Sequence, residues 1–363
     1  MAKPNTNTRR VAILGAGPGG VGTAAVLARR GFDVSLFNRS PQRISAIVEA
    51  GGVTTEGDLG EGFVPLPCVT TNIAEALDGR DVVMCFTPAY GQRPLAELCA
   101  PFMKPGTSFV LASGSAGSLE VAQVFKAHGI DVIGDVLVGE TLTLPQSARM
   151  VGPADVRIKL PWQPRTAAFP ARNNERLYEI LDGVIRTLPS PNVLDTGLNN
   201  VNFIIHPGPM LLNYAAVERA DGYLSLMNEG MTDGVLRCMD ALDAEKMALC
   251  RALGLEPIDI DAVYVELGST PSIYREKGEP FGIRDRIWDR YIEEDTAYGT
   301  VLFSSLGRLL SVPTPVADGI NTLLGVVEQT DFYAQGRTVE TLGLANRSSD
   351  EIQHYLYQGD FNL

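Results

Sequence analysis

The sequence predicts an α/β protein in which a doubly wound parallel sheet (residues 1–190) precedes an all-helical second domain (residues 191–363). Short apolar runs alternate with helical stretches in the first half, as in a parallel sheet covered by helices. From residue 201 onward apolar residues recur at helical spacing instead. Pro189 and Pro191 mark the expected linker. With 363 residues and 45% hydrophobic content, the chain can form two cores.

The first predicted unit is a strand, a glycine turn and a helix, in VAILGAGPGGVGTAAVLARRG at 11–31. The turn satisfies G-x-G-x-x-G, and a second strand is expected at 34–37. The first glycine permits a tight turn, the second lets the backbone approach a pyrophosphate, and the third lets helix and strand pack closely. Because the whole unit takes about 30 residues, it favours a Rossmann-type dinucleotide site over a merely structural turn. The expected cofactor-binding residues of the turn are Gly15, Gly17, Pro18, Gly19 and Gly20.

The residue that closes the second strand bears on the choice of nicotinamide cofactor. An acidic residue there would bind the ribose 2′-hydroxyl and repel a 2′-phosphate. This chain has Asn38, followed by Arg39, Ser40 and Arg43. A neutral amide beside two guanidiniums and a hydroxyl suits a phosphate. We therefore expect NADP(H) in preference to NAD(H); the alternative is that both arginines belong to a solvated helix start.

Further strands are expected at 81–86, 108–113 and 130–135, with helical stretches such as NIAEALDG and LEVAQVFKAHG between them. Ligands of such sheets bind beyond the strand carboxyl ends. Small or polar residues follow these ends and are expected to form the nicotinamide and substrate floor: Thr87 and Pro88, Ser113 to Ser115, and Glu140 and Thr141. His128 lies at a helix end away from this edge and is interpreted as a capping residue.

Composition excludes several kinds of partner. The net charge of −13 disfavours nucleic acids and anionic membranes, because phosphate-binding surfaces are basic. The five cysteines lack CxxC spacing, which predicts buried thiols in a reducing compartment, hence a cytoplasmic protein, and no metal site. No apolar run approaches the roughly 18 residues of a membrane span, so a soluble protein is expected.

The second half opens with NNVNFIIHPGPMLLN at 199–213, which contains His206, one of only three histidines. On a helix Asn202 and His206 are four residues apart and share a face. They predict a polar seam on an otherwise buried helix. Pro207 removes a helical hydrogen bond, so a helix should bend or begin there. The alternative is a core histidine whose hydrogen bonds are all satisfied internally.

Several motifs, with the glycine-rich start, carry a resemblance to a known family. They are GET at 139–141, NNVNFIIHPGPMLLN at 199–213, RYIEEDTAYG at 290–299, LGRLLSVPTPVADGI at 306–320 and TDFYAQGRTVETLGL at 330–344. Over almost its whole length the chain resembles the opine dehydrogenases, which include octopine, nopaline and related N-carboxyalkyl amino acid dehydrogenases. Such enzymes condense a 2-oxo acid, often pyruvate, with the amine of an amino acid and reduce the imine with hydride from the nicotinamide.

The resemblance implies roles for individual residues. His206 corresponds to the catalytic histidine, Asp295 to the carboxylate that partners it, and Arg290 to an arginine that holds a substrate carboxylate. Asn202 and Thr141 are expected to contact the substrate as well. Carbinolamine formation and dehydration need a group that gives and takes protons near neutral pH, which histidine does best. The expected partners are small-molecule substrates, and the expected assembly is a homodimer.

Other interpretations stay open at this point. An exposed charged turn is the alternative for Arg290 and Asp295. A 2-hydroxy or 3-hydroxy acid dehydrogenase of the same architecture is a rival, but such enzymes place a catalytic lysine at the start of the central helix. No lysine occurs between Lys159 and Lys246. A catalytically silent NADP-binding regulator is a second rival, and retention of all three family residues argues against it.

Overall fold

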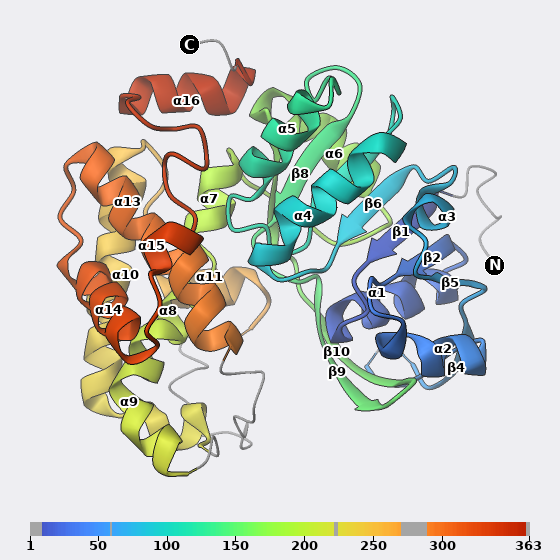
Figure 1. Cartoon of the computed structure of the whole chain (residues 1–363), viewed down its shortest axis with the longest axis horizontal. Helices are drawn as coiled ribbons and strands as arrows, with labels where there is room; N and C mark the ends of the chain where they lie inside the picture. The colour runs from blue at the N-terminus through green and yellow to red at the C-terminus, as the bar shows by residue number, and fades with distance from the viewer. Residues whose placement is uncertain (1–8, 59, 221–223, 270–288, 361–363) are drawn as a thin grey trace. The chain divides into compact units, whose positions relative to one another are not determined.

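The computed structural model describes residues 9–58, 60–220, 224–269 and 289–360. Within these limits the chain forms two compact units, each described here by itself (Figure 1). The first unit comprises the chain up to Thr87, Gly91–Val193 and Tyr357–Gly359. The second comprises Pro88–Tyr90, Leu194–Leu356 and the end from Asp360.

An eight-stranded sheet forms the centre of the first unit, in the order β12-β11-β8-β7-β6-β1-β2-β5. Its strands are β1 (Arg10–Leu14), β2 (Asp33–Phe37), β5 (Cys68–Thr70), β6 (Val82–Cys85), β7 (Ser108–Leu111), β8 (Leu137–Thr141), β11 (Arg165–Phe169) and β12 (Leu188–Pro189). The strands from β5 to β8 in this order are mutually parallel, while β11 runs antiparallel to β8. The predicted doubly wound parallel sheet is therefore confirmed, with its topological switch point between β1 and β6.

The sequences of the central strands follow from their burial. All residues of β6 and β7 are buried, as are the last four of β1, and apart from Ser108 these buried residues are apolar in an unbroken run instead of alternating. The helices of this unit are α1 (Pro18–Arg29), α2 (Ser45–Ala50), α3 (Ile73–Leu77), α4 (Ala89–Cys99), α5 (Ser118–Ala127) and α6 (Asn174–Leu181). The first two residues of α4, Ala89 and Tyr90, group with the second unit. His128 caps the end of α5, as expected, and its Nδ1 lies 2.9 Å from the Val124 carbonyl oxygen.

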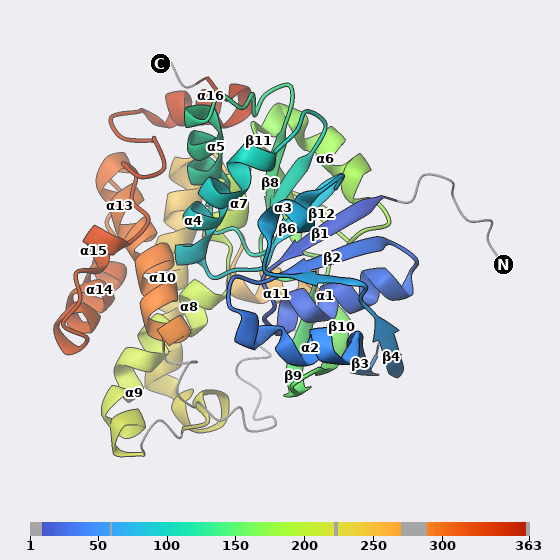
Figure 2. The same ribbon diagram turned by 45° about the vertical axis from the view of Figure 1, so that its right-hand side comes forward.

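A second, four-stranded sheet was not anticipated from the sequence. It has the order β4-β3-β10-β9, with β3 (Gly52–Gly57), β4 (Gly62–Pro65), β9 (Gln146–Gly152) and β10 (Asp155–Pro161). Helix α1 contacts all four of these strands as well as β1 and β2, so it lies between the two sheets (Figure 2). Burial alternates along most of β9, as expected for a strand with one face packed and one exposed.

Three local predictions for the first unit were wrong. Residues 130–135 form a turn, because the Asp131 side chain accepts a hydrogen bond from the Ile133 backbone N–H; the strand lies later, in β8. Glu140 and Thr141 belong to the end of β8 and not to the loop after it. Pro189 ends the short strand β12, at the sheet edge where proline is tolerated.

The described part of the second unit is built of helices, as predicted. They are α7 (Val193–Leu198), α8 (Asn202–Ile205), α9 (Pro207–Arg219), α10 (Asp233–Ala252), α11 (Ile260–Glu266), α13 (Val301–Leu310), α14 (Pro315–Val327), α15 (Phe332–Gln335) and α16 (Ser349–Gln358). Helix α10 packs against α8, α9, α13 and α14, so it is central to the bundle (Figures 1 and 2). Among the described residues no helix has the length and apolarity to cross a membrane.

Three short π-helical segments complete the second unit: Leu226–Gly230, Asp289–Glu294 and Thr296–Thr300. The second segment packs on α9, and the third packs on α8, α13, α14 and α15. A π turn accommodates one more residue than an α turn and often marks a functional site. These two segments flank Asp295, and their contacts bring this part of the chain against the junction of α8 and α9.

Candidate active site

The glycine turn of the first unit has the geometry that a bound pyrophosphate requires. Gly15 has φ +114°, and a Cβ on it would lie 2.6 Å from the Phe86 carbonyl oxygen. A Cβ on Gly20 would lie 1.9 Å from the Gly15 carbonyl oxygen, so helix and turn touch only because both residues are glycine. At Gly17, in contrast, no atom lies within 4 Å of a Cβ, which leaves the backbone open to a ligand. With Pro18 opening α1, this turn fits a dinucleotide.

The residues after β2 divide into two groups. The Asn38 side chain accepts a hydrogen bond from the Ala16 N–H at 3.1 Å and donates one to the Ser40 carbonyl oxygen at 3.1 Å, so it braces the glycine turn. Arg39, Ser40 and Arg43 are exposed. Neither arginine has an ion pair with any described residue. Two unpaired guanidiniums beside a hydroxyl fit a phosphate group at this position.

In the second unit, His206 lies at the bend between α8 and α9. Its backbone N–H donates to the Asn202 carbonyl oxygen at 3.1 Å, and its own carbonyl accepts from the Met210 N–H at 2.8 Å. Pro207 then opens α9, which explains the break that the sequence predicted at this position. The imidazole is therefore carried by a nearly continuous helical backbone and is 5% exposed.

A carboxylate holds this imidazole. The Asp295 Oδ2 lies 2.7 Å from His206 Nδ1, and both side chains are almost fully buried. Asp295 sits between the π-helical segments Asp289–Glu294 and Thr296–Thr300. Because the carboxylate accepts at Nδ1, the proton of a neutral imidazole belongs on that nitrogen and Nε2 is left to exchange protons. Nε2 forms no hydrogen bond or ion pair with a described residue.

Sequence reasoning missed a second contact of this histidine. The ring of Tyr291 stacks on the imidazole with centroids 3.6 Å apart and planes 14° apart. Tyr291 and Asp295 are four residues apart, so one face of the segment supplies both contacts. The motif RYIEED contained the tyrosine, but only the folded backbone shows which of its side chains meet His206.

Arg290 is held by the residue next to Asp295. Its Nε lies 3.4 Å from Oε2 of Glu294, and its side chain is 53% exposed. The other Glu294 oxygen, Oε1, accepts a hydrogen bond from the Ala89 N–H at 2.9 Å. The exposed charged turn that is the alternative for Arg290 would pair it with Asp285, Asp289 or Glu293; the side chains of Asp285 and Asp289 lie outside the described residues.

Burial and neighbouring charges shift the pKa values of Glu294 and Arg290. Burial raises the pKa of the Glu294 carboxyl, and the adjacent Asp295 raises it further, against the opposing effects of Arg290 and the Ala89 N–H. Desolvation lowers the pKa of Arg290, but the Glu294 and Asp295 carboxylates outweigh it and raise that pKa above its ordinary value. Arg290 is therefore a permanent cation beside two acidic groups.

The remaining predicted site residues differ in whether their polar side-chain groups already form hydrogen bonds within the protein. The Asn202 side chain is partly exposed and has no hydrogen bond to a described residue, so it is available to a ligand. Thr141 is fully buried in the first unit: its hydroxyl accepts from the Ser113 N–H and donates to the Thr143 carbonyl oxygen. This favours a role for Thr141 in fixing the loop after β7.

The predicted residues after β6 lie where the chain passes from one unit to the other. Thr87, two residues beyond the end of β6, contacts the Cys85 side chain through its hydroxyl. Pro88 begins the short segment Pro88–Tyr90, which groups with the second unit.

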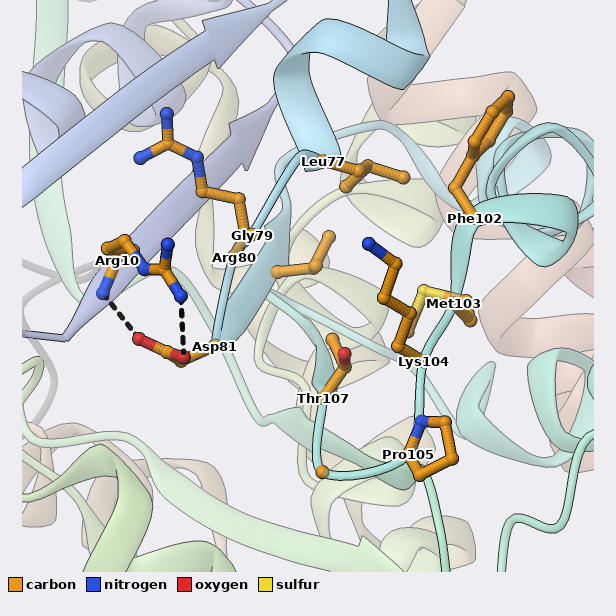
Figure 3. A pocket seen from close by; sticks show the side chains of 12 residues that line it. Arg10, Leu77, Gly79, Arg80, Asp81, Phe102, Met103, Lys104, Pro105 and Thr107 are labelled. Carbon is orange, nitrogen blue, oxygen red and sulfur yellow. Dashed lines mark hydrogen bonds and ion pairs between the residues drawn. The ribbon is translucent and has the colours of Figure 1, made fainter.

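A cavity of about 250 Å³ in the first unit lies away from the glycine turn of that unit. Figure 3 shows Arg10, Asp81 and Thr107 among its lining residues, and the Arg10 side chain pairs with Asp81. These residues stand at or next to the beginnings of β1, β6 and β7, whereas the glycine turn follows the end of β1. The cavity is thus at the opposite edge of the sheet from the nucleotide turn. Among the described residues no group of three metal-ligating side chains occurs.

Comparison with known proteins assigns the chain to a family. A model described as NAD/NADP octopine/nopaline dehydrogenase, alpha-helical domain, matches residues 189–327, and a ketopantoate reductase PanE/ApbA model matches residues 11–159. The opine dehydrogenase of Arthrobacter sp. (strain 1C) is 31% identical over 356 residues, which cover 95% of this chain and 98% of that protein. The chain belongs to the opine dehydrogenase family. This opine dehydrogenase family member is accordingly an NAD(P)-dependent oxidoreductase acting on CH–NH donors.

Solved structures of other opine dehydrogenases share the fold. Octopine dehydrogenase with NADH and L-arginine matches with a TM-score of 0.72 at 16% identity, covering 97% of this chain and 98% of that one. NADP⁺-bound yersinopine dehydrogenase matches with a TM-score of 0.70 at 16% identity, covering 98% and 99%. These matches confirm the predicted fold class, a Rossmann-type sheet followed by a helical part, for this member of the family.

Proposed function

We propose that this enzyme condenses a 2-oxo acid with the amine of an amino acid and reduces the resulting imine, with His206 and Asp295 as its acid–base pair. The observation that carries the proposal is the buried contact of 2.7 Å between His206 Nδ1 and Asp295 Oδ2. A carboxylate at Nδ1 fixes the tautomer and stabilises the imidazolium, so Nε2 can take and return a proton.

The proton steps follow from this arrangement. Nε2 accepts a proton from the substrate ammonium, and the amine so freed attacks the carbonyl carbon of the 2-oxo acid to form the carbinolamine. The imidazolium then returns this proton to the carbinolamine hydroxyl, which leaves as water and gives the protonated imine. Tyr291 keeps the ring in one plane while its charge changes. Arg290, whose two terminal nitrogens form no hydrogen bond or ion pair with a described residue, binds the carboxylate of the 2-oxo acid. Asn202, one turn before His206, offers its amide to the substrate.

We propose NADP(H) as the preferred cofactor, which would supply the hydride for the imine. Arg39, Ser40 and Arg43 are exposed at the position where NAD-binding relatives of this fold carry an acid. Yersinopine dehydrogenase binds NADP⁺ and octopine dehydrogenase binds NADH, so the choice depends on this chain's own residues.

A substrate matrix with one variant tests the function. Amino acids are combined with pyruvate, glyoxylate and 2-oxoglutarate, and NADPH absorbance is followed. We expect consumption that needs both an oxo acid and an amine, and His206→Ala should lower turnover at least about a hundredfold while NADPH affinity is kept. Consumption with the oxo acid alone would indicate a hydroxy acid dehydrogenase instead, and unchanged turnover in His206→Ala would remove that residue from the mechanism.

A further inference from the structure

Glu294 has an unusual position for an acid next to a substrate-binding arginine. It is adjacent to Asp295 in the chain, its side chain is 16% exposed, and both of its carboxylate oxygens are engaged. One oxygen accepts from the Ala89 N–H and the other faces Arg290 Nε. A free 2-oxo acid carries the same kind of group, so Glu294 could either hold the arginine for the substrate or compete with the substrate.

The atoms involved favour the first possibility. Glu294 contacts Arg290 at Nε, the inner nitrogen, at 3.4 Å. The two terminal nitrogens form no hydrogen bond or ion pair with a described residue, and they make up the fork that receives a carboxylate in an end-on, bidentate manner. A competing carboxylate would occupy that fork. A contact at Nε leaves it open and restricts the rotation of the guanidinium.

The second oxygen of Glu294 fixes the carboxylate itself. The Ala89 N–H that it accepts is the first of α4, where backbone N–H groups lack helical partners and favour an anion. Burial disfavours the charged form of the Glu294 carboxyl and so raises its pKa. A charged group kept at such a position despite its desolvation is a common feature of functional sites.

We infer that Glu294 is a positioning residue: it ties Arg290 Nε to the Ala89 N–H and so presents the two terminal nitrogens of Arg290 to the carboxylate of the 2-oxo acid. The inference rests on the proposed function. It predicts a defect in binding of the oxo acid, and not in proton transfer or in nucleotide binding, when the carboxylate is removed.

The test compares Glu294→Gln and Glu294→Asp with Glu293→Gln, which removes the neighbouring exposed acid of the same run. Initial rates are measured against the oxo acid at saturating amine and NADPH. For Glu294→Gln we expect the KM for the oxo acid to rise about tenfold, the loss of one charge-assisted contact, while kcat changes less than about threefold. Glu294→Asp, which keeps the charge with a shorter reach, should lie between. Glu293→Gln should match the wild type.

A binding measurement supports the kinetics and does not depend on turnover. The Kd of oxamate, an unreactive analogue of a 2-oxo acid, is measured with NADP⁺ bound and should rise by a similar factor in Glu294→Gln. In an Arg290→Lys background, which lacks Nε, Glu294→Gln should add little further loss. If Glu294→Gln acted only by lowering the stability of the fold, its effect on oxamate binding would be the same in both backgrounds.

Three outcomes would overturn the inference. A lower KM or tighter oxamate binding in Glu294→Gln would show that the carboxylate competes with the substrate. Equal values in Glu294→Gln and Glu293→Gln, with normal wild-type turnover, would remove the positioning role alone. Absence of wild-type turnover with every oxo acid and amine would remove the proposed function, and the positioning role would fall with it.

Discussion

Tyr291 and His206 form a face-to-face pair at 3.6 Å in which the tyrosine ring covers one side of the imidazole. Asp295 already fixes the imidazole at Nδ1. A hydrogen bond at one nitrogen still allows the ring to tilt about that contact, whereas a stacked neighbour prevents the tilt. The two contacts together leave Nε2 in one direction, which is what a proton exchange with a bound substrate requires.

Replacement of Tyr291 should therefore affect the chemical step more than binding. Stacked aromatic pairs contribute roughly 0.5–1.5 kcal/mol beyond burial, so Tyr291→Leu should lower kcat roughly two- to tenfold. Tyr291→Phe keeps the ring and should retain most of the activity. Single-turnover measurement of NADPH oxidation with both substrates bound checks this, and equal rates for Leu and Phe would contradict a role for stacking.

At the scale of elements, the approach of α8 to the π-helical segment Thr296–Thr300 determines whether Asp295 can reach His206. A Cβ on Gly299 would lie 2.3 Å from the Phe203 ring, so these elements pack closely because residue 299 is glycine. Phe203 in turn meets Phe303 edge to face, with ring centroids 6.1 Å apart. A small residue at 299 is thus part of what aligns the proposed acid–base pair.

Gly299→Ala should destabilise the protein by about 1–3 kcal/mol, the usual cost of overpacking, and should lower kcat as well. In a Phe203→Leu background the same change should cost less, because the ring that it meets is gone. Gly319→Ala in α14 is the matched control: no atom lies within 4 Å of its Cβ, so it should be neutral or slightly stabilising. Thermal unfolding and kcat are measured for all four variants; equal loss at 299 and 319 would refute the packing argument.

At the scale of the whole molecule, the residues proposed for cofactor binding and those proposed for acid–base chemistry lie in different units. The glycine turn and the arginines after β2 belong to the first unit, and His206 with Asp295 belongs to the second. The chain has a net charge of −13, but salt screens exposed charges that lie far apart. An anionic nucleotide at Arg39 and Arg43 therefore interacts mainly with these two nearby guanidiniums. Changes to the nucleotide site should therefore alter cofactor choice without altering the acid–base chemistry.

The cofactor prediction follows from this separation. Asn38→Asp combined with Arg39→Ala should shift the ratio of kcat/KM for NADPH over NADH towards NADH by at least about tenfold, since one charge-assisted contact is lost and a repulsive charge is added. Aspartate can still accept from the Ala16 N–H, so the glycine turn should persist. At saturating cofactor, kcat should remain near that of the wild type. An unchanged ratio would mean that the 2′-phosphate is not bound there.

Local sequence patterns accounted for much of the fold. The glycine turn, the buried strands β1, β2, β6 and β7 and the break at Pro207 each depend on residues adjacent in the chain, and periodicity and backbone preference detect such features. The patterns missed the four-stranded sheet, because β3 and β10 are neighbours only in space. They also placed a strand at 130–135, where Asp131 makes a turn through a side-chain hydrogen bond.

The sequence by itself determined the nucleotide turn, the two-part architecture and the identity of His206, Arg290 and Asp295 as residues to examine. Only the tertiary structure decided that Asp295 meets Nδ1, that Tyr291 covers the ring, and that Glu294 contacts Arg290. The reason is physical. Several adjacent side chains could reach a given atom. The one that does so is determined by the extra residue in each π turn and by the packing of helices that are distant in the chain. The local spacing of residue types shows neither of these.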